Sequence, residues 1–456
     1  MDWQFLSLIP NWLVALLTVL VPMVAADIDD LFRELKDSVV TETWTRGHNL
    51  VNRLMSGAET KQVNTRAYIF TRQNSMGGDA RSHTFDAASF AAGTNPFTDQ
   101  LSLSAIGAAV SYSATSLMQY AAANTKVAVR PFMARYIASM MDGFKEHFEC
   151  WLNAPSNDGV MAILSGVQNT TEYILNSVDD LSGGYLLLDG STYQIIAAAA
   201  FPATIRATGP YRVLPDGTGL DKRANPAIVQ FAQSNGSAAA AIAGFTAEDR
   251  VVAFGGGNAW FNSIPYHVSS LATGTWQGAN RSAPINRCTR VNGGQSQLTA
   301  AMVRRLLAAI AKYKGTAGAT DGLIPYCSQD QIVQWLNSAQ AMTAIRLTDA
   351  AGDGIGEIYD RMLGDVKVNK KAPLVSNRCN PTQFRFIRLS DYVWISMQEP
   401  EFRPNVAGGK LHEQHDGDGL LVSGHTAIIQ YLGNLGCRDV TSQGVAYDLT
   451  KPTLED

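Results

Sequence analysis

The clearest hydrophobic pattern in the chain lies between residues 131 and 152. Apolar residues recur there at helical spacing and form a broad stripe, while most charged residues fall on the other side. The stripe consists of Phe132, Met133, Tyr136, Ile137, Met140, Met141, Phe144, Phe148, Trp151 and Leu152, opposite Arg135, Asp142, Lys145, Glu146 and Glu149. Because proline suits the first helical position, the pattern predicts a helix from Pro131 to Leu152, about 33 Å long.

The segment from Thr65 to Ile106 has a different character. Two strand-like runs flank Met76-Gly77-Gly78-Asp79, and a Gly/Pro-rich return passes through Gly93 and Pro96. The segment lacks the apolar density for a core of its own. It therefore predicts a long two-stranded excursion that is stable only when laid on something else.

The second half of the chain mixes short strands with helices. The segment from Tyr185 to Gln297 is rich in Gly, Ala and Asn, and it contains the strand candidates "YLLLDG", "YQIIAAAAF" and "DRVVAFGGG". A helix is then predicted from Leu298 to Ile310, ending between Lys312 and Gly315. The run "GLIPYC" predicts a strand, and Ser328 with Gln331 predicts a capping box that opens a helix. Strand-like "FRFIRL", "YVWISM" and "GLLVSGHTAIIQYL" follow, so the predicted class is α+β.

An apolar run from Trp12 to Ala26 stands near the start of the chain. As a helix it would span about 22 Å, short of a hydrocarbon core of about 30 Å. Val24-Ala25-Ala26 resembles a signal-peptide cleavage site, but Asp2 is the only charge before Asp27, so the positive n-region is missing. We expect an apolar arm that packs against protein, followed by an acidic helix from Asp27. A retained signal segment is the alternative.

Composition narrows the function classes. The 456 residues are 46% hydrophobic and 17% charged, which fits a folded chain that buries much of its surface. A formal net charge of −4 gives no basic footprint for tight nucleic-acid binding. The five cysteines are widely spaced and odd in number, which predicts buried thiols and neither a disulfide framework nor a zinc site.

The residues that could carry chemistry form no convincing site. The loop Gly255–Gly257 lacks the lysine of a P-loop and is better read as a tight turn. The metal-ligand candidates are His412, His415, Asp416 and Asp418, and separately Asp349, Asp353, Glu357 and Asp360. Neither set has the spacing of a known metal motif, and a solvated turn is the simpler reading. The lone His425, in a predicted strand, is read as a packed residue, and Lys367, Lys370 and Lys371 as an exposed turn or a contact with a neighbouring subunit. We therefore predict no catalytic residue and no cofactor.

The order of these elements resembles the HK97-fold major capsid proteins of tailed phages. The resemblance is carried by "FKEHFECWLNAPSNDGVMAIL", where a spine helix would end in an Asn/Gly/Pro turn before a strand. It is also carried by "RAYIFTRQNSMGGDARSHTFDAASF" at the place of the extended loop, and by "LTAAMVRRLLAAIAKYKG" with "DGLIPYCSQDQIVQWLNSA" at the place of the axial domain. The resemblance implies an α+β HK97-like capsid fold with an N-terminal arm, an extended β-hairpin loop, a long spine helix in a peripheral domain, and an axial domain with an insertion.

The resemblance also implies a division of the chain. The predicted parts are an arm and helix (1–60), an extended loop (61–112), a peripheral domain with the spine helix (113–184), an inserted subdomain (185–297), an axial domain (298–390) and C-terminal strands that return to the core (391–456). Some family members crosslink subunits through a lysine in the extended loop. Thr65 to Ile106 contains no lysine, and Lys61 lies at its base, so we expect a shell held by non-covalent contacts.

Under this resemblance the protein is expected to be a structural component of a virion, assembled in the host cytoplasm. Its partners would be further copies of itself in hexamers and pentamers, packaged double-stranded DNA bound without sequence preference, and portal, scaffold and decoration proteins, with no membrane. The candidate inter-subunit contacts are Trp12, Leu16, Leu20, Arg72, Met76, Gly77, Gly78, Asp79, Arg81, Phe85 and Phe90. The alternatives are an encapsulin-like compartment shell and a secreted enzyme or binding protein.

Overall fold

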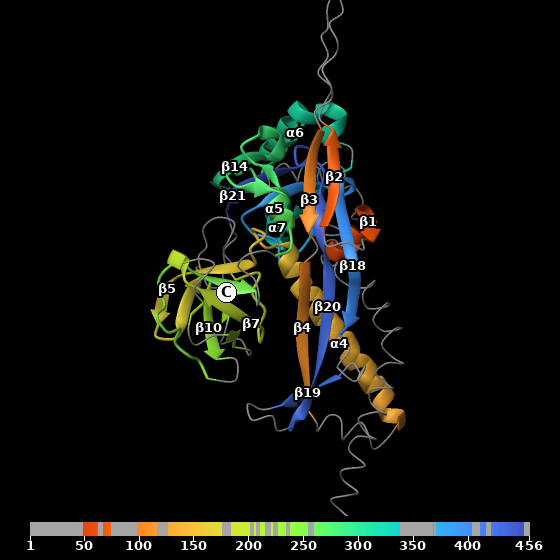
Figure 1. Cartoon of the computed structure of the whole chain (residues 1–456). Coiled ribbons are helices and arrows are strands. Elements are labelled where there is room, and N and C mark those ends of the chain that lie inside the picture. Colours follow the sequence, from red (N-terminus) through yellow and green to blue (C-terminus); the bar gives the residue numbers. More distant parts are fainter. Residues whose placement is uncertain are drawn as a thin grey trace, which may run out of the picture. The chain divides into compact units, whose positions relative to one another are not determined.

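The computed structural model of the chain is shown in Figure 1. It describes residues 49–62, 67–73, 98–104, 106–115, 126–175, 184–200, 205–206, 210–214, 220–221, 227–233, 238–253, 260–320, 322–337, 368, 371–403, 411–415 and 421–450. The chain divides into two compact units. One comprises 1–48, 107–147 and 398–432, and the other comprises 49–106, 148–397 and 433–456.

The predicted long helix is present as α4 (Lys126–Leu152), and it continues from the first unit into the second. It begins five residues before Pro131, so the prediction that Pro131 opens it is wrong. A proline inside a helix removes one backbone hydrogen bond and is usually unfavourable, which is why the sequence signal reads as a start. Here Pro131 falls in the second turn, and about 40 Å of helix forms around it.

The part of the apolar stripe that the structure describes, from Ile137 to Leu152, is buried as predicted. Ile137, Met140, Met141, Phe144 and Phe148 are at most 2% exposed. Lys145 and Glu149, which lie opposite the stripe, are buried as well. Burial lowers the pKa of the Lys145 ammonium, against the raising effect of Asp142. These two positions thus mark a second contact surface of the helix, whereas Asp142 is exposed.

Replacing Phe144 with alanine is expected to destabilise the subunit by about 3–5 kcal/mol, because a fully buried aromatic side chain is lost and a cavity remains. Urea unfolding of the full chain measures this loss. The exposed Ser139→Ala on the same helix serves as the control and should change stability by less than about 0.5 kcal/mol. Equal unfolding midpoints for Phe144→Ala and the parent would show that α4 does not face a core.

A sheet of five strands contains the C-terminal runs that the sequence predicted. Its order is β1-β18-β20-β19, and β4 also pairs with β20. The strands are β1 (Glu59–Gln62), β4 (Ile106–Thr115), β18 (Tyr392–Phe402), β19 (Leu411–His415) and β20 (Leu421–Cys437). The short helix α2 (Asn49–Gly57) precedes β1, which runs parallel to β18.

Antiparallel strands after α4 close into a barrel. The order β6-β5-β11-β7-β8-β10 returns to β6, because β10 pairs with β6 as well as with β8, and β9 adds a further pairing to β10. The strands are β5 (Val160–Asn169), β6 (Glu172–Leu175), β7 (Thr192–Ile196), β8 (Tyr211–Val213), β9 (Leu220–Asp221), β10 (Ile228–Gln233) and β11 (Asp249–Ala253). Closure removes the unpaired edges that an open sheet would present.

The barrel combines predicted and unpredicted features. "VMAIL" and "DRVVAFGGG" form strands as expected, whereas "YLLLDG" forms turns, so that strand prediction is wrong. Tyr173 and Tyr211 pack against Phe231 inside the ring, with centroids 6.1 and 6.2 Å away. The ring takes strands both from 160–175 and from 192–253, so the pairing groups residues across the expected boundary at 185. The boundaries themselves stay a prediction.

An ion pair with a fully buried carboxylate lies at the start of β11. Arg206 Nε and Nη2 donate to the two carboxylate oxygens of Asp249 at 2.8 and 2.7 Å, and the Thr246 hydroxyl donates to the same group at 2.8 Å. Burial alone would raise the pKa of Asp249, but the hydrogen bonds from Arg206 and Thr246 hold it below the ordinary value. A buried carboxylate with this many donors is fully paired, which is what makes its burial tolerable.

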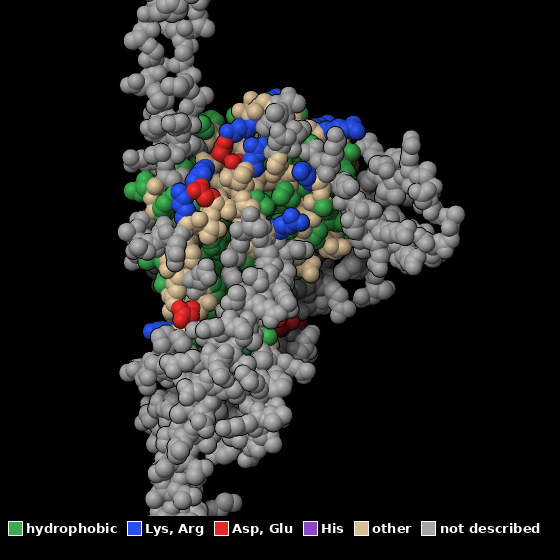
Figure 2. Space-filling view, turned by 90° about the vertical axis from the view of Figure 1, so that its right-hand side faces the viewer, with side chains coloured by type: hydrophobic (Ala, Val, Ile, Leu, Met, Phe, Trp, Pro, Cys, Tyr) green, Lys and Arg blue, Asp and Glu red, His purple; other side chains and the backbone are tan. Residues whose placement is uncertain are grey.

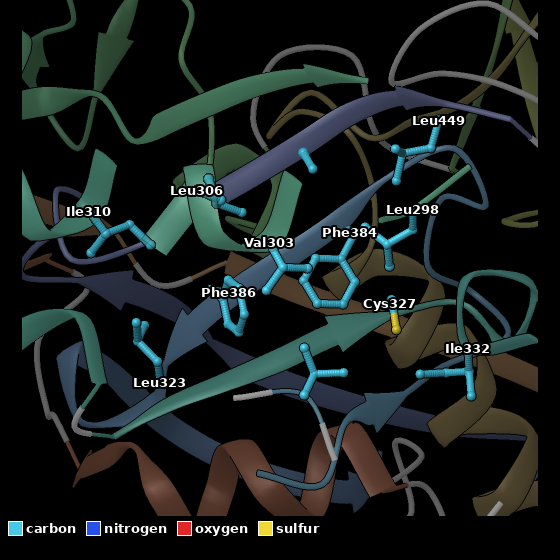
Figure 3. Close-up of a cluster of buried hydrophobic side chains, with 12 residues drawn as sticks. Leu298, Val303, Leu306, Ile310, Leu323, Cys327, Ile332, Phe384, Phe386 and Leu449 are labelled. Atoms are coloured by element: carbon cyan, nitrogen blue, oxygen red, sulfur yellow. The ribbon is translucent and has the colours of Figure 1, made fainter. Parts of the chain in front are cut away.

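A second five-stranded sheet has the order β14-β21-β17-β15-β16. Its strands are β14 (Thr289–Ser296), β15 (Leu323–Cys327), β16 (Leu374–Val375), β17 (Phe384–Arg388) and β21 (Gly444–Leu449). The helices α6 (Ala300–Thr320) and α7 (Gln329–Asn337) contribute buried residues to its core. Figure 3 shows that core, in which Leu306 and Ile310 of α6 meet Phe384, Phe386 and Leu323 of the sheet. The predicted strands "GLIPYC" and "FRFIRL" are β15 and β17.

The two helix ends predicted here have different outcomes. The end of the first helix is confirmed, since α6 kinks at Gly315, whose φ of 73° suits glycine. The capping box at the start of α7 is wrong. The Ser328 hydroxyl has no hydrogen-bond partner among the described residues, and Gln331 Nε2 donates to the carbonyl oxygens of Pro381 at 2.5 Å and Thr450 at 3.3 Å. Long-range acceptors thus outcompete the local cap.

Candidate functional site

The predicted two-stranded excursion is present as the antiparallel pair β2 (Ala67–Gln73) and β3 (Thr98–Ser104), which lie side by side in Figure 1. Seven residue pairs are in register, from Ala67 with Ser104 to Gln73 with Thr98. Leu101 and Leu103 of β3 are buried, whereas Ile69 of β2 is 61% exposed. The hairpin therefore has an inward apolar face and an outward face that carries a large exposed side chain.

A tight turn from another part of the chain meets the base of this hairpin. Strands β12 (Thr275–Trp276) and β13 (Ala279–Asn280) are joined by Gln277 and Gly278, with φ of 51° and 84°. Two successive residues with positive φ define the type I′ turn that suits tight hairpins. A Cβ on residue 278 would stand 2.8 Å from the Ser102 hydroxyl oxygen, so glycine is needed both for conformation and for space.

Gln277 joins three segments that are distant in the sequence. Its backbone carbonyl accepts the N–H of Ser102 at 2.9 Å, on the side of β3 away from β2. Its side chain makes a paired contact with the backbone of Cys437, donating from Nε2 at 2.6 Å and accepting at Oε1 at 3.1 Å. The Gln277 N–H also donates to the Tyr266 hydroxyl at 3.0 Å. One buried amide thus ties the hairpin to β20.

Asn434 makes a second buried tie at the same place. Its Oδ1 accepts the backbone N–H of Asn262 at 2.8 Å, and its Nδ2 donates to the carbonyl of Ser104 at 2.7 Å. Both Gln277 and Asn434 are at most 4% exposed. Buried polar groups with all partners present hold a geometry firmly, because breaking one bond leaves a desolvated group unpaired. We call Gln277, Asn434 and their partners the hairpin root.

His267 supports the root from the short helix α5 (Ile264–His267). The indole N–H of Trp276 donates to His267 Nδ1 at 3.0 Å, and because an indole can only donate, the proton of the neutral ring is on Nε2. Nε2 accordingly donates to the carbonyl of Leu435 at 3.1 Å. Complete burial lowers the pKa of His267 to about 3, so the ring is neutral at physiological pH.

Charged groups surround the root. The guanidinium of Arg281 is 4% exposed, lies 5.0 Å from the centre of the Tyr266 ring and donates to the Tyr266 carbonyl at 2.5 Å. Burial lowers the pKa of Arg281. Near the start of the hairpin, Lys61 pairs with Glu59 at 3.0 Å and lies 5.3 Å from the centre of the Tyr68 ring. Arg438 also pairs with Glu59.

An aromatic cluster lies at the end of α4. Phe148 makes edge contacts with Trp151, Phe261 and Trp394 at centroid distances of 5.5–5.9 Å. Trp151 stacks on Phe261 at 5.9 Å and meets the edge of Trp260 at 5.6 Å. Asn262 follows this cluster directly. The segment that carries the root is therefore fixed by the same packing that ends the long helix.

Most of the predicted contact residues lie outside the described residues, and they stay a prediction. These are Trp12, Leu16, Leu20, Met76, Gly77, Gly78, Asp79, Arg81, Phe85 and Phe90. Arg72 lies on β2, paired with Asp99 of β3. The candidates Gly255–Gly257, Asp349 to Asp360, Asp416 and Asp418 also fall outside the described residues, while His412 and His415 lie on β19.

Sequence reasoning missed the root residues. The dipeptide Gln277-Gly278 between short apolar runs is a weak turn signal, and it could have indicated a hairpin. Nothing in the sequence marks Asn434 or His267, because their partners lie far away in the chain.

The described residues give no sign of a catalytic or metal site. No group of three or more metal-ligating side chains gathers within them. All five cysteines are buried and free, and burial raises the pKa of the Cys327, Cys379 and Cys437 thiols, so these do not form reactive thiolates. Within the described part of the chain, no helix is long and apolar enough to cross a membrane.

Comparison with known proteins gives a likeness of structure only. No family model and no curated protein matches the chain. The solved structures that match include capsids of phages and of a GTA particle. The cyanophage A-1(L) capsid asymmetric unit is 10% identical, with 87% of this chain and 93% of that chain covered and a TM-score of 0.46. The capsid of a native GTA particle is 10% identical, with 88% and 90% covered and a TM-score of 0.40. The structure from Gordonia phage Cozz is 7% identical, with 88% and 87% covered and a TM-score of 0.42. At these values no residue role is carried over.

Proposed function

We propose that the protein is the major capsid protein of a tailed phage, a structural protein and not an enzyme. It assembles as hexamers and pentamers into an icosahedral shell that encloses double-stranded DNA. The observation that carries the proposal is the rooted hairpin. Its base is held by two buried amides, Ile69 is exposed on its outward face, and 24 residues, 74–97, separate its two strands.

Such an arm suits a subunit that reaches a neighbour. An isolated two-stranded hairpin is marginally stable in water and needs further packing. Here the packing at the base is supplied by β13 and β20, which fixes the direction in which the strands leave. Repeated contacts of one surface with a different surface of the next copy generate rings and shells when the rotation closes.

Shell formation is tested on the proposed arm itself. Deleting Gly77 to Asp79, or making Phe85→Asp, is expected to leave a folded subunit that fails to form closed shells. Negative-stain electron microscopy of the purified chain measures assembly, and thermal unfolding measures folding. Normal shells from both variants would contradict the placement of the intersubunit contact in this segment.

What the unmutated protein forms, and what copurifies with it, distinguishes between the function classes. Closed icosahedral shells with copurified DNA would support the proposal. Shells that hold a cargo protein would favour an encapsulin-like compartment, and a stable monomer at high concentration would refute a shell role.

A further inference from the structure

The segment 251–320 contains no aspartate or glutamate. It does contain seven cationic residues, namely Arg281, Arg287, Arg290, Arg304, Arg305, Lys312 and Lys314. The whole chain has a net charge of −4, so the rest of the chain is more acidic than that figure indicates. Within a chain that is acidic elsewhere, such a segment creates a positive electrostatic potential at the places where its cations reach the surface.

The cations reach the surface along one side of α6. Val303, Leu306 and Ile310 face the core, and the exposed positions on the opposite side are Arg304, Arg305 and Lys312, separated by the small Ala301 and Ala308. Arg304 and Arg305 stand seven to eight residues before Lys312, about 11–12 Å along the helix axis. Figure 1 places α6 near the top of the view, and Figure 2 shows Lys and Arg side chains on the surface at that level.

Helix stability does not account for this arrangement. Lys314 pairs with Asp439 of the turn after β20, but Arg304, Arg305 and Lys312 form no ion pair with any described residue. Because α6 has no acidic residue, pairs at spacing i, i+4 within the helix cannot form. The helix dipole favours cations only in the last turn, which excludes Arg304 and Arg305.

We propose that the outward side of α6, formed by Arg304, Arg305 and Lys312, binds the phosphate backbone of double-stranded DNA. The inference rests on the proposed function, because a shell interior brings DNA against the subunit. Duplex DNA carries a charge about every 1.7 Å, and the separation of the cations is close to the roughly 12 Å width of its major groove. Arginine guanidinium groups bind phosphate through two parallel hydrogen bonds.

A second copy of the chain fits this surface less well. The exposed described carboxylates Asp142, Asp189 and Glu248 lie on three separate segments of the chain, so none of these segments offers a matching group of three acidic side chains. A polyanion with evenly spaced charges therefore complements the α6 surface better than another subunit does.

Binding of a fluorescent 20-base-pair duplex of mixed sequence to the full chain tests the inference. With three phosphate contacts, the association constant should fall about 40-fold between 50 and 200 mM NaCl, because each contact contributes about 0.9 to the logarithmic salt slope. The double variant Arg304→Gln/Arg305→Gln should show a fall of about 3–4-fold, with one contact left. Lys371→Gln removes an exposed cation outside segment 251–320 and should behave like the parent.

The outcomes separate this inference from the proposed function. Absent binding, an unchanged salt slope in the double variant, or equal competition by polyglutamate at matched charge would each overturn DNA binding by α6. Weak competition by polyglutamate, with the slope lost in the double variant, supports it. Electron microscopy of the same preparations reports on shells independently: shells with an unaltered slope refute only the α6 inference, and a chain that never assembles refutes the proposed function.

Discussion

Replacing Gln277 with alanine is expected to abolish shell assembly and to lower the stability of the subunit by about 2–4 kcal/mol. The side-chain amide forms two hydrogen bonds with the backbone of Cys437 in a buried place. Its removal leaves a buried N–H and a buried carbonyl without partners, and each costs about 1–3 kcal/mol. The turn carbonyl that holds Ser102 then loses its attachment to β20.

Alanine is the right replacement for Gln277, because alanine and glutamine pay a similar conformational free energy for the positive φ at this position. Residue 277 has a φ of 51°, a conformation that is unfavourable for glutamine and for alanine alike. A glycine here would relax the turn and would mix two effects of opposite sign. The difference between Gln277→Ala and the parent therefore reports the side-chain contacts with Cys437.

Two measurements on the same samples check this expectation. Urea unfolding gives the free energy, and electron microscopy gives the fraction of closed shells. Gln233→Ala removes an exposed glutamine from β10 of the barrel and should leave both unchanged. If Gln277→Ala lost stability but assembled as well as the parent, the root would stabilise the subunit without orienting the hairpin.

Local patterns in the sequence predicted the elements that local physics controls. The stripe of α4 follows from helical periodicity, and the pairing of β2 with β3 from two strand-like runs on either side of a turn-rich centre. Gly315 ends the first part of α6 because few other residues adopt positive φ. In each case the determining contacts lie within a few residues.

The failures have the opposite cause. Gln331 was predicted to cap its own helix, but it bonds residues 50 and 119 positions away. Lys145 and Glu149 appear polar in a helical pattern, yet the Ser376 hydroxyl donates to Glu149 at 2.5 Å from 227 positions away. Likewise, Asn434 bonds Ser104 across 330 positions. A single sequence shows neither the distant partner of such a residue nor the burial that makes their hydrogen bond stabilising.

The root also explains how the segment 260–280 links the end of α4 to the base of the hairpin. Trp260 and Phe261 pack on the end of α4, Asn262 and Gln277 bond β20, and the Gln277 carbonyl holds β3. A rigid helix end is thereby linked to the base of the arm through a chain of buried contacts. The direction of the arm is set by the core of the subunit and not by the arm itself.

Acidification from pH 6.5 to pH 4.5 is expected to cost the subunit about 2.3 kcal/mol through His267 alone, because the unfolded ring is already half protonated at pH 6.5. The pKa of this ring is about 3 in the folded chain and about 6.5 when unfolded. A group with a depressed folded pKa contributes stability that is present above the unfolded pKa. That contribution is lost as the pH falls toward the folded pKa, at about 1.36 kcal/mol per pH unit.

The physical reason is the direction of the hydrogen bonds around the ring. Protonation of Nδ1 would set an N–H against the indole N–H of Trp276, which has no acceptor to offer. Burial and the nearby positive charge of Arg281 both disfavour the cation. In the folded state the ring therefore stays neutral, while the unfolded chain takes up a proton and is favoured.

The variant His267→Gln separates this effect from general acid lability. A glutamine can donate and accept but does not titrate between pH 6.5 and 4.5, so the variant should be less stable at pH 7 and should lose about 2.3 kcal/mol less over the window. His147→Gln, at a half-buried histidine of α4, is the matched control for the loss of one histidine ring. Urea unfolding at four pH values between 6.5 and 4.5 measures how the free energy of unfolding of each protein changes with pH. Burial raises the pKa of Asp391, so carboxylates also titrate in this window, but they contribute equally to the parent and to His267→Gln, and the difference between the two slopes therefore reports His267. A slope in His267→Gln equal to that of the parent would show that another group makes the subunit acid-labile, and that the Trp276–His267–Leu435 contact does not control the stability of the root.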